Sequence, residues 1–253
     1  MTAIDAALPR GSLRPVKWSG PLGLLIARPV FLLAAQGLAA LLLAVQDDPA
    51  PFRSSAKYWT IWSSLADLAT LLLLTRLARG EGLRVGDLMN FKRKGLGRDV
   101  FQGLSLFPLV LALNIGGLIL GSLMVYGSWL PTGIPAGLAG RVLPLWAILF
   151  SRLLWWPLWS WMEEISFNGY ALPRLASLTG KSWAAVALVT FAWSIQHMFL
   201  PVILDARFLL WRFLVFIPFN LVSSLLFLRL RRLTPIVLSH WGMDLLSTLF
   251  TIA

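Results

Sequence analysis

Residues 155–170 read WWPLWSWMEEISFNGY, and this stretch places two adjacent carboxylates, Glu163 and Glu164, behind a row of tryptophans. The stretch continues an apolar run that begins near residue 142. A charged side chain at bilayer depth costs roughly 2.5–3.5 kcal/mol on insertion scales, so such side chains mark functional positions. The stretch therefore predicts a membrane-spanning helix that carries a polar site.

The composition of the whole chain indicates a membrane protein. Of its 253 residues, 58% are hydrophobic and 13% are charged, whereas a soluble domain carries about 25% charged residues. The apolar runs do not alternate as barrel strands do, and a helix satisfies its own backbone in lipid. We therefore expect an all-α, polytopic transmembrane helical bundle. The chain has no cysteine, which excludes disulfides and thiol chemistry.

Seven apolar runs are each long enough for a bilayer, which needs about 20 residues. The fourth run is over-long and contains Pro157, so either seven or eight helices result. We expect residues 1–18 to form a cytoplasmic tail and residues 19–253 to form a single integral-membrane domain. The runs cover residues 19–46, 57–79, 100–126, 142–172, 182–203, 206–229 and 234–252.

The net charge of +11 follows a membrane pattern, because the basic residues punctuate hydrophobic runs. Fifteen lysines and arginines fall in the tail and alternate loops on one side, and four fall in the opposite loops. Basic loops favour the cytoplasm, so we expect a cytoplasmic N-terminus, contact with anionic lipid and no nucleic-acid partner. Arg28 falls inside the first span, where we expect its side chain to extend to the membrane surface.

Both histidines of the chain, His197 and His240, fall inside predicted spans. His240 and Asp244 are four residues apart and therefore share a helix face. Isolated polar groups in a membrane would be left unsatisfied. We therefore expect Glu163, His197, His240 and Asp244 to converge on one cavity, open to the cytoplasm or the inner leaflet.

The adjacent carboxylates differ in direction, because neighbours on a helix point about 100° apart. We expect one of Glu163 and Glu164 to face the cavity and the other to face a structural partner. Trp193 lies one turn before His197 and places an aromatic ring beside the imidazole.

Two kinds of chemistry fit these groups. A carboxylate and an imidazole can deprotonate and orient a water, while a second imidazole stabilises an oxyanion. Alternatively, Glu163, His197 and His240 would hold a divalent metal such as zinc, with an open position for water. The short metal motif H-E-x-x-H is absent.

Three motifs, in order, resemble those of the CPBP family of intramembrane proteases, which includes CAAX proteases and bacteriocin-processing proteins. That family shows EExxxR, then FxxxH, then HxxxN or HxxxD on successive helices. This chain has EEISFN at 163–168, WSIQH at 193–197 and HWGMD at 240–244. The resemblance covers about residues 140–252 and implies a catalytic core in the last four spans.

The resemblance implies an intramembrane endopeptidase, glutamate-type or metal-dependent, in a bacterial inner membrane. Its substrate would be a membrane peptide or a lipidated protein. Glu163 would be the general base, and His197 would help to polarise the attacking water. His240 and Asp244 would form the oxyanion side, with Glu164 and Trp193 in support.

Two positions depart from the family pattern: Asn168 stands in place of arginine, and Trp193 in place of phenylalanine. An arginine at position 168 could pair with Glu164, whereas an asparagine carries no charge. Glu164 would then be neutral or would pair with Arg152 or Arg212. This departure favours an alternative function, a catalytically impaired scaffold, immunity or regulatory protein. A proton-coupled transporter is a third possibility, opposed by the absence of an inverted repeat.

Overall fold

The computed structural model describes residues 16–130 and 142–251, and all the regular structure in these ranges is helical. Residues 1–15 of the predicted tail lie outside the described residues. The helices are α1 (Ser19–Ala44), α2 (Pro51–Ser55), α3 (Trp59–Gly80), α4 (Leu96–Tyr126), α5 (Leu145–Phe150), α6 (Trp156–Glu164), α7 (Leu172–Thr179), α8 (Ser182–Met198), α9 (Ala206–Leu230) and α10 (Thr234–Thr251).

The predicted helical membrane bundle is confirmed, with seven long helical segments in the described ranges. Six of them are α1, α3, α4, α8, α9 and α10, and the seventh runs without a break from α5 to α7. Four segments are long and apolar enough to cross a membrane by length and composition: Ser19–Ala44, Pro51–Gly80, Val85–Tyr126 and Ala206–Leu230.

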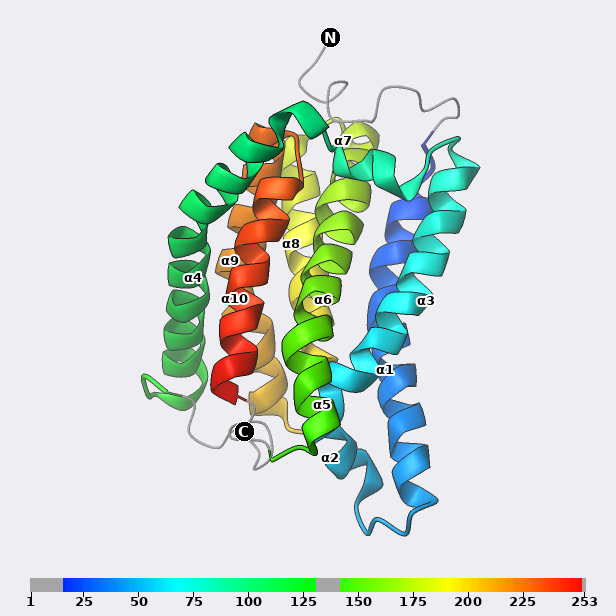
Figure 1. Cartoon of the computed structure of the whole chain (residues 1–253), viewed down its shortest axis with the longest axis vertical. Coiled ribbons are helices and arrows are strands. Elements are labelled where there is room, and N and C mark those ends of the chain that lie inside the picture. The colour runs from blue at the N-terminus through cyan, green and yellow to red at the C-terminus, as the bar shows by residue number, and fades with distance from the viewer. Residues whose placement is uncertain (1–15, 131–141, 252–253) are drawn as a thin grey trace.

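The long segments run side by side along the long axis of the molecule (Figure 1). α4 packs against α9 and α10, α8 packs against α9, and α10 packs against α6. α1 packs mainly against α3 and also touches α8. Helix α6 therefore lies among elements from both halves of the chain.

The over-long fourth run is one helix with two π-helical stretches, Ser151–Trp155 and Ile165–Ala171. A proline follows each stretch, Pro157 in α6 and Pro173 in α7. A proline ring clashes with the carbonyl four residues earlier and donates no hydrogen bond, so widened turns next to it have a local cause. The second π stretch begins directly after Glu164, and such bulges are frequent at functional sites.

Close packing of α4 on α9 depends on a glycine. A Cβ atom added to Gly117 would lie 2.0 Å from the carbonyl oxygen of Val215. Only a residue without a side chain allows the two backbones to approach in this way. The contact fixes α9, which supplies Ser223 and Phe216 to the site described below.

Candidate active site

Glu163 of α6 lies at the centre of a polar cluster that three helices build. Its Oε1 is 3.7 Å from Nε2 of His197 on α8, and its Oε2 is 3.6 Å from Nε2 of His240 on α10. The three side chains are 0%, 4% and 2% exposed, respectively. The structure thus brings together one carboxylate and both imidazoles of the chain.

His240 has a carboxylate at each of its ring nitrogens. Its Nδ1 lies 3.1 Å from Oε1 of Glu164, and its Nε2 lies 3.5 Å from Oδ2 of Asp244. Asp244 in turn accepts a 2.5 Å hydrogen bond from the hydroxyl of Ser160. Ser160 was not predicted from the sequence, although it lies one turn before Glu164 on the same helix.

Glu164 is buried against neutral hydrogen-bond donors. Asn168 Nδ2 donates to its Oε2 at 2.7 Å, and the Ser223 hydroxyl donates to its Oε1 at 3.0 Å. Asn168 Oδ1 accepts from the Ser224 hydroxyl at 2.9 Å. The asparagine at the family's arginine position is therefore fully hydrogen-bonded on both sides of its amide.

The contacts of Glu164 are with neutral donors and with His240, and Arg212 makes other contacts. The partners of Glu164 are Asn168, Ser223 and His240. Arg212 instead donates to the carbonyl oxygens of His197, at 3.1 Å, and Leu200, at 2.5 Å. Arg212 therefore satisfies backbone groups at the end of α8, where carbonyls lack partners within the helix.

The sequence predicts that one of Glu163 and Glu164 faces the cavity and the other faces a structural partner, and the contacts of Glu164 modify this prediction. Glu164 has structural partners, as expected, but it reaches His240 as well. Both adjacent carboxylates touch this imidazole because its two nitrogens lie on different edges of the ring. Glu163 contacts Nε2 and Glu164 contacts Nδ1.

Aromatic rings fix the directions of the polar groups. Trp193 stacks on Phe167, with ring centres 4.7 Å apart and planes at 6°, and meets Phe219 edge-on. His197 stacks on Phe216, with ring centres 3.6 Å apart. Aromatic rings therefore border the site, but Trp193 lies beside His240, with ring centres 6.2 Å apart, and the ring stacked on His197 is that of Phe216 of α9. Phe167 comes from η5 (Ile165–Ala171).

Arg28 of α1 does not extend to the membrane surface, contrary to the sequence-based expectation. It is 2% exposed, and its Nη2 forms an ion pair with Asp67 Oδ1 of α3 at 3.2 Å. Its Nε donates to Gln196 Oε1, and its guanidinium lies 5.1 Å from the ring centre of Trp159. Gln196 Nε2 donates to Glu163 Oε1. Buried charges need such partners, and sequence alone did not reveal that these helices meet.

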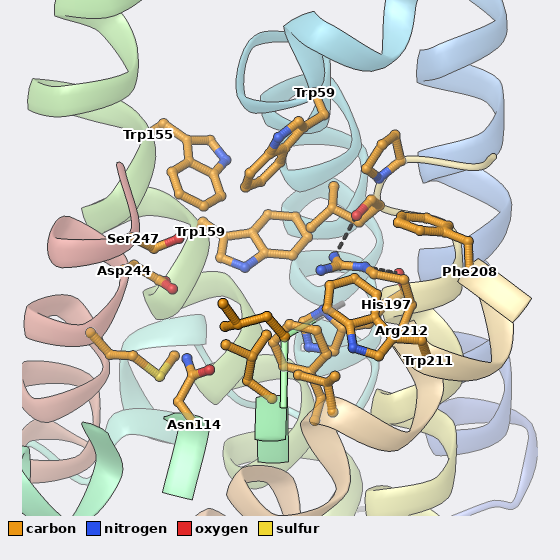
Figure 2. A pocket seen from close by; sticks show the side chains of 17 residues that line it. Trp59, Asn114, Trp155, Trp159, His197, Phe208, Trp211, Arg212, Asp244 and Ser247 are labelled. Carbon is orange, nitrogen blue, oxygen red and sulfur yellow. Dashed lines mark hydrogen bonds between the residues drawn. The ribbon is translucent and has the colours of Figure 1, made fainter. Parts of the chain in front are cut away.

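A pocket of about 360 Å³ reaches His197 and Asp244. Figure 2 shows the indole rings of Trp59, Trp155 and Trp159 along it, with Phe208 and Trp211 across from them. Trp59 begins α3 and Phe208 lies in the first turn of α9, at the end of the bundle that carries α2 (Figure 1). The pocket therefore extends away from the connection between α3 and α4, which lies at the other end.

A metal site at Glu163, His197 and His240 stays a prediction. Within residues 16–130 and 142–251, no group of three or more histidine, aspartate or glutamate side chains is arranged to hold a metal ion. His240 uses Nδ1 toward Glu164, and Glu163 Oε1 accepts from Gln196.

Comparison with known proteins supports a family for the C-terminal half. Residues 142–246 match the family described as type II CAAX prenyl endopeptidase Rce1-like, so the resemblance predicted from the three motifs is confirmed. The matched segment contains Glu163, His197, His240 and Asp244. No curated protein and no solved structure matches the chain.

Proposed function

We propose that this chain is an intramembrane endopeptidase, because residues 142–246 match the Rce1-like type II CAAX prenyl endopeptidase family. In this proposal Glu163 activates a water that hydrolyses a peptide bond of a membrane-associated substrate. The observation that supports it best is the placement of the Glu163 carboxylate within 3.7 Å of both histidines. A buried base that has imidazoles on two sides suits proton transfer.

The reaction begins with water held by the Glu163 carboxylate and polarised with the help of His197. Glu163 takes a proton from the water as the oxygen attacks the scissile carbonyl carbon. The resulting tetrahedral oxyanion is stabilised by hydrogen-bond donors placed where its charge develops. The C–N bond then breaks, and the proton held by Glu163 passes to the leaving amine.

His240 supplies the donor on the oxyanion side in this scheme, and Asp244 lies beside it. Glu164 holds Nδ1 of His240, which leaves Nε2 directed at the space shared by Glu163 and Asp244. Ser160 holds one oxygen of Asp244 and thereby fixes its rotamer. A donor whose direction is set in advance loses little free energy to reorganisation during the reaction.

The alternative mechanism is a covalent one, in which a serine attacks the peptide bond. Ser239 donates to the backbone carbonyl of Ile236, and Ser194 accepts from Asn220, so neither contacts a base. Ser160 does contact a carboxylate, Asp244. Ser160 is therefore the serine whose removal separates the two mechanisms.

Turnover of a membrane peptide by the purified protein in liposomes tests the proposal. Glu163→Gln should lower kcat by roughly 10²–10⁴-fold, the usual contribution of a general base, because the amide accepts no proton. The fold should persist, since glutamine can still accept the hydrogen bond from Gln196. Ser160→Ala should retain most of the turnover. Undiminished cleavage by Glu163→Gln, or complete loss in a well-folded Ser160→Ala protein, would sink the glutamate mechanism.

The substrate proposed here is a membrane peptide or a lipidated protein, because the pocket beside His197 is lined mainly by apolar side chains, among them four tryptophans and two phenylalanines. Apolar groups bind such walls by area removed from water. The asymmetry of basic loops supports a cytoplasmic N-terminus. In that orientation the pocket extends toward the non-cytoplasmic side, which differs from the opening expected from the sequence.

A second candidate function is a non-catalytic membrane protein that binds its partner through the same pocket. Asn168, in place of the family's arginine, is the observation that favours it. Binding of a membrane peptide that is never cleaved, with equal affinity for the wild type and Glu163→Gln, would support this function over the first.

A further inference from the structure

Three buried side chains from three helices lead to the Glu163 carboxylate from the side opposite His240. Asp67 pairs with Arg28, Arg28 donates to Gln196, and Gln196 donates to Glu163. Gln196 is fully buried, and Arg28 and Asp67 are 2% and 5% exposed. Two of these residues, on α1 and α3, lie outside the matched family segment.

The direction of the hydrogen bonds from Arg28 through Gln196 to Glu163 follows from the donors and acceptors of these side chains. A guanidinium has only donors, so the side of Gln196 that faces Arg28 must be its carbonyl oxygen. The amide NH₂ of Gln196 must then face Glu163 and donate to Oε1. If Arg28 were absent, the Gln196 oxygen would lose its donor, and the amide would be held only by its bond to Glu163.

This order distinguishes the two oxygens of Glu163. Oε1 accepts from Gln196, whereas Oε2 has no hydrogen-bond partner among the described residues and lies 3.6 Å from His240 Nε2. A base needs a lone pair that is directed at the proton it removes. Oε2 meets this condition because no donor among the described residues uses its lone pairs, whereas one lone pair of Oε1 accepts from Gln196.

We propose that Arg28, held by Asp67, is a positioning residue that acts through Gln196 to orient Glu163, with Oε2 presented to the reacting water. The inference rests on the proposed hydrolysis, in which Glu163 is the base. It assigns to the first two long helices a part in the chemistry of the last four. A simple packing role for the Arg28–Asp67 pair would not require Gln196.

Enzyme kinetics in liposomes separate a positioning role of the Arg28–Asp67 pair from a packing role. The double substitution Arg28→Met with Asp67→Leu removes both charges together, since removing one alone would leave the other buried and unpaired. We expect kcat to fall about tenfold or more while KM stays within about twofold, because positioning acts on the chemical step. In a Gln196→Met background, the same double substitution should lower kcat no further, since the contact through which it acts is already lost.

A second, partly buried ion pair supplies the control. Arg174 of α7 pairs with Glu81 at 2.5 Å, and Arg174 is 11 residues from Glu163, about 16 Å along a helix. Arg174→Met with Glu81→Leu should change the unfolding temperature and leave kcat unchanged. Multiplicative losses in the Gln196→Met background, or an effect carried by KM, would overturn the positioning role.

A measurement that is independent of turnover tests the chain of contacts itself. Unfolding temperatures of the wild type, Gln196→Met, the Arg28/Asp67 double substitution and their combination form a double-mutant cycle. If Arg28 acts through Gln196, the two shifts in unfolding temperature should not add, because both variants remove the hydrogen bond between Arg28 and Gln196. Strictly additive shifts would overturn the proposed coupling between Arg28 and Gln196 even if no substrate is cleaved. Absence of cleavage by the wild type would instead overturn the proposed function. The double-mutant cycle would still show whether Arg28 and Gln196 are coupled.

Discussion

Asn168 shows how one residue can hold the first motif together without a charge. It is completely buried between Glu164, Ser223 and Ser224. Neutral donors satisfy the Glu164 carboxylate there, so an arginine is not needed to compensate a missing hydrogen bond. Asparagine, at the position where the resemblance predicts arginine, therefore belongs to an intact hydrogen-bonding network.

Restoring the family residue should consequently harm this protein. Asn168→Arg places a longer, charged side chain against the hydroxyls of Ser223 and Ser224, and a buried charge without a preformed site costs several kcal/mol. We expect a lower unfolding temperature and turnover reduced by about tenfold or more. Asn168→Asp, which keeps the size but adds a negative charge beside Glu164, should be harmful as well. A rise in activity on Asn168→Arg would instead indicate that asparagine had impaired an ancestral enzyme.

The ligand geometry leads to a prediction about metals. Because the described histidines and acids form no metal centre, turnover should persist after exhaustive treatment with a membrane-permeant chelator. The measurement is peptide cleavage in liposomes before and after treatment, with metal content followed by elemental analysis. Loss of activity that is restored by zinc alone would contradict this prediction.

Some individual residues could be placed from the sequence and others could not, for physical reasons. The two histidines and Glu163 could be selected from the sequence because polar groups in apolar runs are expensive. Arg28 was misplaced by the same reasoning, since a long side chain near a helix end usually reaches the surface. Its partners Asp67 and Gln196 lie 39 and 168 residues away, and no local pattern indicates that these helices meet.

At the scale of elements, the fourth run shows what proline can and cannot reveal. Pro157 predicted either a kink or a break, and the helix continues with a π-helical stretch before each of its prolines. The number of helices was therefore bounded correctly, whereas the shape of the helix depended on packing. A rule based on periodicity alone cannot place a widened turn.

The contact between α4 and α9 gives a test at this scale. Gly117→Ala should push the helices apart, because its Cβ would lie 2.0 Å from the Val215 carbonyl oxygen. Overpacking of this kind typically costs about 1–3 kcal/mol, visible as a lower unfolding temperature in detergent.

Gly116 is the matched control for that test. A Cβ added there meets no atom within 4 Å, so Gly116→Ala should be neutral or stabilising by about 0.5–1 kcal/mol through helix propensity. Equal unfolding temperatures for the two variants would contradict the close approach of α4 and α9.

At the scale of the whole molecule, the direction of access can be measured. The chain has no cysteine, so single cysteines can be placed at two exposed positions at opposite ends. Lys92 lies between α3 and α4, and Leu204, 85% exposed, lies between α8 and α9 near the pocket. In intact cells, an impermeant maleimide should label Leu204→Cys and not Lys92→Cys. The reverse pattern would place the pocket on the cytoplasmic side.

The contribution of α1 and α3 also sets the smallest unit that can work. A fragment limited to residues 142–246 would keep every histidine and carboxylate that the motifs identify. It would lose the guanidinium of Arg28 and with it the donor that sets the Gln196 amide. Transplanting this segment behind the first helices of another protein would therefore move the proposed catalytic residues without the side chains that we propose orient them. The boundary drawn by sequence similarity is narrower than the boundary of the site.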